Sequence, residues 1–121
     1  MRVALAGDMG RGVFADRAVA AGEVLGSFYT IHICAAERPA ALQTALRDFI
    51  FFDEDGSAEV VLGWLSLVNH GQPNIVKSWR ATQLGPVVTV TAARDLAAGE
   101  QLYFDYQFDP GTEPDWARRP G

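Results

Sequence analysis

Three short sequence blocks contain residues that could bind a ligand or take part in a reaction. They are Gly10-Arg11-Gly12-Val13-Phe14, then Asn69-His70 with Pro73-Asn74, and some thirty residues later Gly99-Glu100-Gln101-Leu102-Tyr103-Phe104-Asp105-Tyr106. Glycines allow a main chain to approach a ligand closely, and a buried asparagine needs hydrogen-bond partners. Aromatic residues can form a core or face a cation. Taken singly, each block also fits a plain structural role: a turn, a loop that orders its own backbone, and an edge strand that packs half of its aromatic residues.

The histidines and the cysteine do not indicate a metal site. His32 and His70 are the only histidines, and Cys34 is the only cysteine. Cys34 and His32 would point to one face of a strand, but no further ligand follows at a suitable spacing. One cysteine allows neither an internal disulfide nor a thiolate zinc cluster. A nucleophile and base formed by Cys34 and His70 stays open, although no flanking signature favours it.

The acidic residues are also better explained as structural. The glycine of Asp53-Glu54-Asp55-Gly56 comes too early for an EF-hand loop, and no glutamate closes a twelve-residue frame. We therefore interpret this run as a solvated turn. Glu23 and Glu100 could be an acid and base pair, but each lies in a turn and needs no catalytic role.

Length and charge limit the function classes. A chain of 121 residues has room for one core, so we expect one domain. The net charge of -5 makes nucleic acid an unfavourable direct partner and suits a basic peptide better. The opening residues are too short and polar for a secretory signal, and no apolar run has membrane-spanning length. We expect a soluble cytoplasmic protein, with the nucleus and secretion into a host cell as open alternatives.

The elements that position these residues are mostly short strands. Their expected bounds are Val13 to Ala15, Val24 to Ile33, Val87 to Ala92 and Gln101 to Phe108. Glu59 to Leu62 fits either a strand or a helical turn. The spacing of Leu42, Leu46, Phe49 and Ile50 predicts one helix over Pro39 to Phe52.

An internal repeat also predicts structure. Arg17 to Leu25 and Arg94 to Leu102 share one pattern, in which Val19 or Leu96 precedes a turn containing Gly22 or Gly99. We expect the two apolar residues to be buried and the two glycines to adopt positive φ. Two copies are too few for a solenoid.

In this order and within a chain this short, the three blocks resemble the signature blocks of a SET domain, the fold of most protein lysine methyltransferases. The resemblance runs from about Gly10 to Tyr106 and is greatest to the minimal, zinc-free SET domains of large DNA viruses. It implies a mainly β fold with short strands in several small sheets, one insert helix and a C-terminal pseudoknot. The Asn69 to Asn74 loop and the Tyr106 strand would be the two partners of that pseudoknot. The implied domain covers residues 1–109, followed by a tail of residues 110–121.

The resemblance implies S-adenosyl-L-methionine as the cofactor. The matching cofactor-binding positions are Gly10, Arg11, Gly12, Asn69, His70 and Tyr106, with Trp116 in the tail expected to cap the cofactor. Gly71 departs from the family, which usually has serine after the Asn-His pair. The implied catalytic residue is Tyr106, whose hydroxyl would align the reacting groups.

The resemblance also implies a lysine channel with aromatic walls, formed by Phe104 and by either Phe28 or Tyr29. The substrate would be a lysine of a basic protein or peptide, with a histone or histone-like protein as one example. Phenylalanine at position 104 favours di- and trimethylation. A non-catalytic SET-fold module that binds a peptide or partner is the alternative. The predicted insert helix would offer Leu46, Phe49 and Ile50 as an apolar face for a homodimer.

Overall fold

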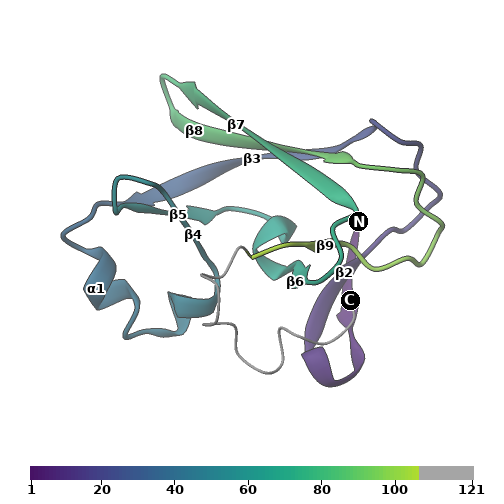
Figure 1. Ribbon diagram of the computed structural model, residues 1–121, viewed down its shortest axis with the longest axis horizontal. Coiled ribbons are helices and arrows are strands. Elements are labelled where there is room, and N and C mark those ends of the chain that lie inside the picture. The colour runs from purple at the N-terminus through teal and green to yellow at the C-terminus, as the bar shows by residue number, and fades with distance from the viewer. Residues whose placement is uncertain (107–121) are drawn as a thin grey trace.

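Three β-sheets form the described part of the chain, residues 1–106, in a computed structural model of the protein (Figure 1). In the first sheet, β1 (Arg2–Leu5) pairs antiparallel with β2 (Arg11–Phe14). The second sheet has the order β4 (Ile50–Phe52), β5 (Ala58–Val61), β3 (Val24–Ile33), β8 (Gly85–Ala92) and β7 (Ile75–Thr82), and all its pairings are antiparallel. In the third, β6 (Asn69–His70) runs parallel to β9 (Tyr103–Phe104).

Helical structure is short. The described residues contain one α-helix, α1 (Arg38–Ala41), and three 3-10 turns, η1 (Gly7–Met9), η2 (Ala45–Asp48) and η3 (Trp64–Leu67). None of the helices within residues 1–106 has the length and apolar character needed to cross a bilayer.

The β7–β8 hairpin presents one face to the core. Residues opposite each other in an antiparallel pair point to the same face. Val88, Val90 and Ala92 are buried, and their register partners are Trp79, Lys77 and Ile75. The core face of β7 therefore carries these three residues, and the alternating residues Val76, Ser78 and Arg80 face outward. The buried cluster also takes in Val13 of β2, Leu65 of η3, and Leu102 and Phe104 around β9.

The prediction of a single helix over Pro39 to Phe52 is wrong. Only its first turn is α-helical, as α1, and its end is the strand β4 paired with β5. Thr44 causes the break: its hydroxyl donates to the Ala41 carbonyl at 2.7 Å and accepts the Leu46 N–H at 3.2 Å. A threonine that bonds the backbone in both directions competes with a continuous helix. One short insert helix remains.

The break also separates the apolar residues that were expected on one helix face. Leu46 lies in η2 and is 42% exposed, whereas Ile50 begins β4. The single helical surface predicted for a homodimer therefore does not exist, and dimer formation itself stays a prediction.

Most predicted strands are confirmed with adjusted ends. Val24 to Ile33 matches β3 at both ends, and Glu59 to Leu62 proves to be a strand, β5. The strand predicted over Gln101 to Phe108 is only two residues long within the described chain, as β9. Strands β1, β6 and β7 were not predicted from the sequence. The predicted domain end at residue 109 and the tail of residues 110–121 lie outside the described residues.

The repeated pattern forms two matched turns, Arg17–Leu25 and Arg94–Leu102, which we call the twin turns. Val19 and Leu96 are 3% and 2% exposed, and their backbones exchange two hydrogen bonds, of 2.9 and 2.8 Å. Gly22 and Gly99 adopt φ values of 81° and 85°, as predicted. The two copies therefore stabilise each other across the molecule.

The glutamates of the twin turns form ion pairs within their own turns. Glu23 pairs with Arg17, and Glu100 pairs with Arg94. The adjacent arginine, through its hydrogen bond, holds the pKa of each carboxyl below its ordinary value. These contacts support the structural interpretation of both residues.

Candidate functional site

The parallel pair β6–β9 brings the second and third sequence blocks together near the middle of the molecule (Figure 1). Asn69 lies opposite Tyr103 and His70 opposite Phe104, and the Gly71 N–H donates to the Phe104 carbonyl at 3.2 Å. These are the two segments that the sequence predicted as partners. Passage of one segment through the other, as in a pseudoknot, stays a prediction.

Asn69 connects both segments to the first block. Its Nδ2 donates to the Arg11 carbonyl and to Gln101 Oε1, both at 2.9 Å. Gly12 makes this arrangement possible, because a Cβ there would lie 2.7 Å from Gln101 Oε1 and 3.0 Å from Asn69 Nδ2. The lack of a side chain at Gly12 therefore leaves space for the side chains of Asn69 and Gln101, in addition to any role toward a ligand. Gly10 differs: its φ is 76°, and the position of a Cβ has no atom within 4 Å.

His70 holds the main chain at Tyr106. Its Nδ1 accepts the Tyr106 N–H at 3.0 Å, and the two rings lie 5.2 Å apart at 63°. Asp105 Oδ1 is 3.8 Å from the same nitrogen. An Nδ1 that accepts an amide proton carries no proton itself, so this arrangement describes the neutral ring with its proton on Nε2. A salt bridge to Asp105 would require loss of the Tyr106 hydrogen bond.

The side chain of Tyr106 is partly buried, and its hydroxyl lies beside the segment that precedes β6. It donates to the Val68 carbonyl at 2.7 Å. Burial raises the pKa of Tyr106 to about 12. The phenol therefore stays protonated at neutral pH and acts as a neutral, oriented group and not as a phenolate base.

Asn74 is structural rather than ligand-binding. It is 2% exposed, its Nδ2 donates to the Gln101 carbonyl at 2.8 Å, and its Oδ1 accepts the Tyr103 N–H at 2.8 Å. The Asn74 side chain thus supplies hydrogen bonds to the main chain of Gln101 and Tyr103, just before Phe104.

A wall of aromatic side chains lies beside Tyr106. Phe104 is 7% exposed, lies 4.9 Å from the Tyr106 ring, and stacks on Phe51 of β4 at 5.5 Å and 23°. Trp79 of β7 meets Phe51 edge to face at 5.8 Å. Phe51 and Trp79 were not predicted, because they come from a segment expected as helix and from an unpredicted strand.

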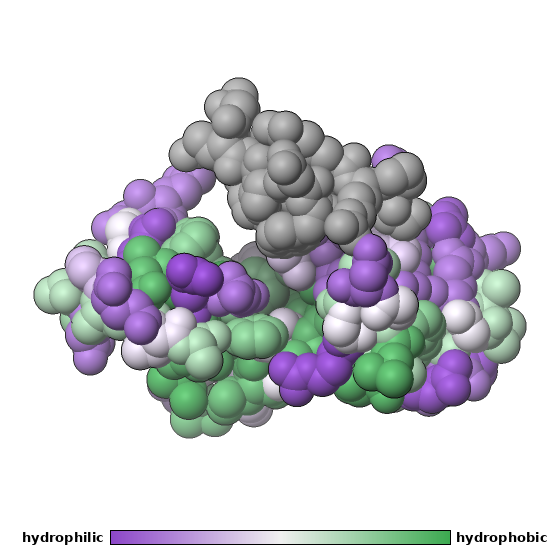
Figure 2. All heavy atoms as spheres, turned by 90° about the horizontal axis from the view of Figure 1, so that it is seen from below, coloured by the Kyte–Doolittle hydropathy of each residue, from purple (hydrophilic) through white to green (hydrophobic). Residues whose placement is uncertain are grey.

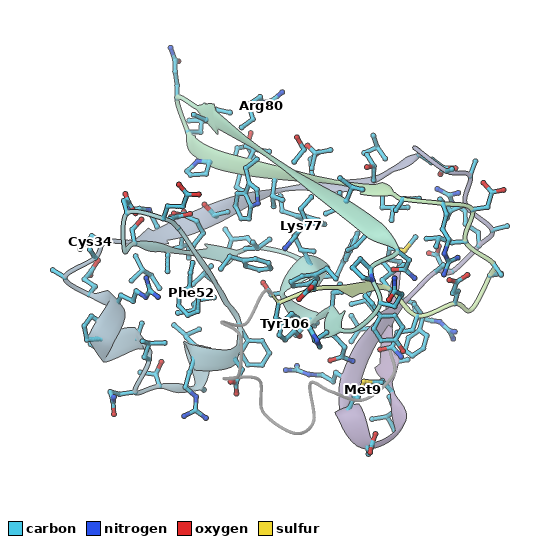
Figure 3. All side chains as sticks on the ribbon, in the orientation of Figure 1. Met9, Cys34, Phe52, Lys77, Arg80 and Tyr106 are labelled. Atoms are coloured by element: carbon cyan, nitrogen blue, oxygen red, sulfur yellow. The ribbon has the colours of Figure 1, made fainter. Side chains whose placement is uncertain are left out.

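Lys77 completes this wall with a cation. Its Nζ lies 3.9 Å from the centre of the Phe104 ring and 5.2 Å from that of Phe51. Burial lowers the pKa of Lys77, and the Asp105 carboxylate opposes that shift. Figure 3 shows Lys77 extending from β7 toward the middle of the molecule, near Tyr106.

These residues line one cleft. It is bounded by Arg11, the η2–β4 segment from Arg47 to Glu54, residues 66–70, Lys77, Trp79 and residues 104–106. The cleft thus joins Arg11, Asn69, His70, Phe104 and Tyr106, all predicted as site residues. In the space-filling view, apolar and hydrophilic side chains alternate on the face of the molecule seen from below (Figure 2).

Two residues predicted for the lysine channel lie elsewhere. Phe28 packs edge to face on Trp64 at 5.0 Å, and Tyr29 is 52% exposed; neither lines the cleft. Gly63 leaves space for the Phe28 ring, since a Cβ there would lie 2.2 Å from it. The structure therefore does not bring Phe28 or Tyr29 to Tyr106. Trp116 lies outside the described residues.

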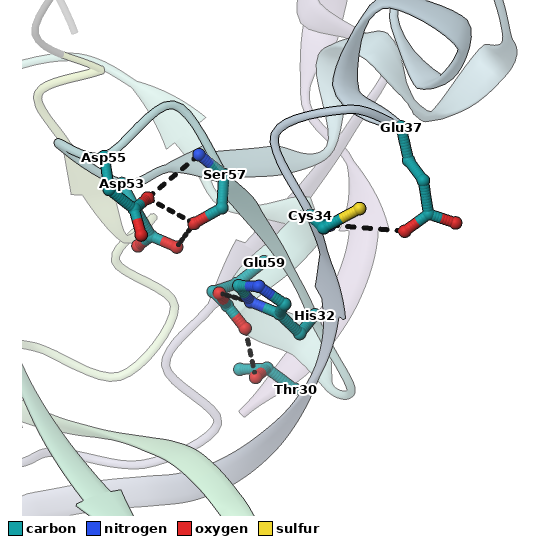
Figure 4. Close-up of polar contacts among 8 residues, drawn as sticks. All are labelled: Thr30, His32, Cys34, Glu37, Asp53, Asp55, Ser57 and Glu59. Atoms are coloured by element: carbon teal, nitrogen blue, oxygen red, sulfur yellow. Dashed lines mark hydrogen bonds and ion pairs between the residues drawn. The ribbon is translucent and has the colours of Figure 1, made fainter.

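A separate polar cluster lies where β3 ends and β5 begins (Figure 4). Glu59 is 2% exposed, and its carboxylate accepts from Thr30 at 2.8 Å and contacts His32 Nδ1 at 2.6 Å. This hydrogen bond raises the pKa of His32. Ligand atoms of His32, Glu59 and Asp53 lie within 4.8 Å of one another. The sequence showed no spaced partners for His32, because these carboxylates come from other segments.

That cluster is satisfied by its own hydrogen bonds, and the expectation of no metal stays a prediction. Cys34 follows it at the end of β3, where its N–H contacts Glu37 at 3.3 Å. Figure 3 places Cys34 near one end of the molecule and Tyr106, which His70 contacts, near the middle. The geometry therefore gives no support to a Cys34–His70 nucleophile and base.

Comparisons with known proteins agree with this arrangement. The family model of the SET domain matches residues 10–107. No curated protein matches the sequence. One similar solved structure is a candidate histone methyltransferase of Plasmodium falciparum, with 21% identity, a TM-score of 0.73, and coverage of 89% of this chain and 97% of that one.

Two further similar structures belong to longer chains, of which this chain covers only a part. Polycomb Repressive Complex 2 of Chaetomium thermophilum, autoinhibited and bound to S-adenosylmethionine, gives 21% identity and a TM-score of 0.70 over 86% of this chain and 14% of that one. The protein CpSET8 of Cryptosporidium gives 20% identity and a TM-score of 0.66, over 88% of this chain and 57% of that one. At these identities the likeness establishes the fold.

Proposed function

The chain belongs to the SET domain family, and from that premise we propose that it transfers methyl groups from S-adenosyl-L-methionine to lysine side chains of a protein. The observation that carries the proposal is the meeting of Asn69, His70 and Tyr106 beside an aromatic wall in one cleft. The three motif blocks are far apart in sequence but contribute to a single site.

The residues of the cleft fit the proposed cofactor. Both protons of the Asn69 amide are used within the protein, so the amide offers a ligand its Oδ1 acceptor, which suits an ammonium or hydroxyl group. Gly10 keeps the space beside its backbone open. Gly10, Arg11, Gly12, Asn69 and His70 would hold the cofactor. It would supply an activated methyl group on a sulfonium sulfur.

The protein's own groups would supply orientation and a dry surface. A lysine ammonium has no lone pair, so it must lose a proton before it can accept a methyl group, and apolar surroundings lower its pKa. Phe104 and Phe51 offer such surroundings and attract cationic forms through their ring faces. The protonated Tyr106 hydroxyl, fixed by Val68, would orient the reacting groups. No separate general base is needed if water takes the proton.

The proposed substrate is a lysine of a basic intracellular or host-cell protein, such as a histone or histone-like protein. The net charge of -5 supports a basic partner and disfavours direct nucleic-acid binding. Phe104 has no hydroxyl to hold a water beside the acceptor nitrogen. A growing methylammonium can displace a loosely held water, so we propose di- and trimethyllysine as products.

Calorimetry with S-adenosylmethionine is the first test. The native chain should bind the cofactor, and Asn69→Ala should weaken binding, because it removes the hydrogen bonds to Arg11 and Gln101. Ser78→Ala, on the outer face of β7, is the matched control and should bind normally. Absence of binding by the native chain would refute the proposal.

Methyl transfer to lysine peptides from histone tails is the second test. Incorporation that requires the peptide lysine supports the enzyme. Cofactor binding without transfer to any peptide or to the chain itself would favour the alternative, a non-catalytic module that keeps the fold.

The predicted capping role of Trp116 has its own test. Trp116→Ala, or removal of the residues after Asp109, should weaken cofactor binding while the melting temperature stays unchanged. Equal affinity in the native and altered chains would remove Trp116 from the site.

A further inference from the structure

Lys77 is the only lysine among the 121 residues of the chain. It lies on β7 opposite Val90, which is fully buried, and two residues from Ile75, which is 4% exposed. Alternation along a strand therefore places Lys77 on the core face, where an apolar residue is expected. The neighbouring Arg80 lies on the outer face and extends away from the hairpin (Figure 3).

The Lys77 ammonium lies within the candidate cleft. Its Nζ is 3.9 Å from the centre of the Phe104 ring, which is itself 4.9 Å from that of Tyr106. Phe51 contributes a second ring at 5.2 Å. Among residues 1–106, no carboxylate oxygen lies within 4.0 Å of this nitrogen. The ring faces are thus the main stabilising contacts of the cation in the described structure.

A purely structural role explains this placement poorly. Removing a cation from water is unfavourable, and contacts with ring faces offset only part of that cost. A leucine or methionine would fill the same space without that desolvation. A long lysine on a core face commonly directs its ammonium to water, whereas this one directs it against Phe104. The position of the charge therefore calls for a functional explanation.

We propose that Lys77 is a methyl acceptor of the chain that carries it. The inference rests on the proposed function, since the methyl donor is a sulfonium compound such as S-adenosylmethionine. The Lys77 ammonium first loses a proton to water. Its nitrogen lone pair then forms an N–C bond, the C–S bond of the donor breaks, and the sulfur keeps the electron pair as a thioether.

The reaction takes place in cis. β7 is held to β8 over all eight of its residues, so Lys77 has a fixed position at the wall of its own cleft. The same strand cannot extend its lysine into the cleft of another molecule without separating from β8. Lys77 also occupies space that the side chain of an external lysine would use, so the two acceptors compete.

The position of Lys77 can be tested without any donor. Because the chain has one lysine, the NMR signals of its ε-methylene group belong to a single residue. Phe104 should shift these signals upfield from the values of a free lysine by its ring current, and Phe104→Leu should remove most of that shift. A native spectrum with unshifted lysine signals would overturn the proposal.

Methylation is tested by mass spectrometry of the intact chain with an isotopically labelled donor, followed by peptide mapping. We expect methyl groups at Lys77 in the native chain and none in Lys77→Arg. The matched control is the double variant Lys77→Arg with Arg80→Lys, which keeps one lysine and the same charge but moves the lysine to the outer face. It should remain unmethylated. Melting temperatures establish that each variant is folded.

A mixing experiment separates cis from trans transfer. Tyr106→Phe keeps the acceptor but lacks the proposed catalytic hydroxyl, and Lys77→Arg keeps that hydroxyl but lacks the acceptor. A mixture of the two should leave Lys77 unmodified, and the native rate constant should not change with protein concentration. Methylation in the mixture, or equal methylation of the lysine at position 80, would overturn the proposal.

The outcome for the proposed function is read separately with an external lysine peptide. Transfer to the peptide without transfer to Lys77 refutes the inference and retains the proposed function. Transfer to Lys77 alone supports the inference and identifies the chain as its own acceptor. Absence of both refutes the inference, and absence of donor binding refutes the proposed function as well.

Discussion

The twin turns and the cleft both contain cationic side chains, but they stabilise them in different ways. In the twin turns, Arg17 and Arg94 each pair with a glutamate at the surface. In the cleft, Lys77 faces the rings of Phe104 and Phe51. Surface ion pairs contribute little energy and need no further explanation. A cation held against apolar rings instead of a carboxylate loses hydration at a cost, so this placement indicates a functional role and not a stabilising one.

Tyr106→Phe should cause the largest difference between the two regions. Loss of the hydroxyl removes the group that would orient the reacting atoms, and we expect methyl transfer to fall by at least about 100-fold. The lost hydrogen bond to Val68 should cost about 1 kcal/mol of unfolding free energy. Rates with the best peptide and a denaturant titration measure the two effects.

The control for that variant is Tyr29→Phe, which removes an exposed hydroxyl outside the cleft. It should retain the native rate. A comparable loss in Tyr29→Phe would restore Tyr29 to the lysine channel, and near-native turnover of a folded Tyr106→Phe would remove Tyr106 from catalysis.

Leu96→Ala, in the twin turns, should lower stability and leave cofactor binding unchanged. Leu96 is 2% exposed and its backbone pairs with Val19, so truncation should lower the unfolding free energy by about 3 kcal/mol. The affinity for the cofactor should stay unchanged at a temperature where the variant is folded. Leu84→Ala, at a side chain that is 77% exposed, should change stability by less than about 0.5 kcal/mol. A selective loss of cofactor affinity in Leu96→Ala would contradict the separation of the two regions.

Much of the twin turns could be predicted from the sequence because their interactions are local. A glycine with positive φ, an apolar residue before it and a returning strand all lie within nine residues, and the pattern occurs twice. The pairing of Val19 with Leu96 is the part that only the structure shows.

Only those cleft residues that belong to a sequence motif could be predicted. Asn69, His70, Phe104 and Tyr106 belong to blocks with recognisable order and spacing, and the structure brings them together. Phe51 was hidden in an apparent helix that Thr44 interrupts.

Lys77 and Trp79 were missed for a different reason. They lie on β7, whose polar residues obscure the alternation of a strand. These wall residues meet Phe104 through long-range contacts, which no local pattern encodes.

Phe104→Tyr should change the methylation product of the cleft without changing the fold. The added hydroxyl should hold a water where a methylated nitrogen would expand, so transfer of the second methyl group should slow by about 10-fold, or 1.4 kcal/mol. Mass spectrometry under excess cofactor should then show mainly monomethyllysine. Phe14→Tyr, on β2 outside the cleft, should give the native product distribution. A Phe104→Tyr chain that still reaches three methyl groups would show that this residue does not set the product.

The smallest expected effect is on stability, in Lys77→Met. Because burial lowers the pKa of Lys77 in the folded chain, the unfolded chain binds more protons between that pKa and the ordinary lysine value near ~10.4. Native stability is therefore reduced at neutral pH and recovers as the pH rises through this interval. Lys77→Met lacks the reduction, so its advantage should be largest at neutral pH, below about 1 kcal/mol because the side chain keeps contact with water, and should disappear above the ordinary lysine pKa.

Paired denaturant titrations of native and Lys77→Met chains across this pH range measure the difference directly. Arg80→Met is the control, because it removes a cation from the outer face of the same strand, where the charge remains hydrated. Its difference from the native chain should not vary with pH in this interval. An advantage of Lys77→Met that grows with rising pH would have the wrong sign, because it would mean that the pKa of Lys77 is raised and that a carboxylate such as Asp105 stabilises the ammonium. The twin turns and the cleft would then stabilise their cations in the same way.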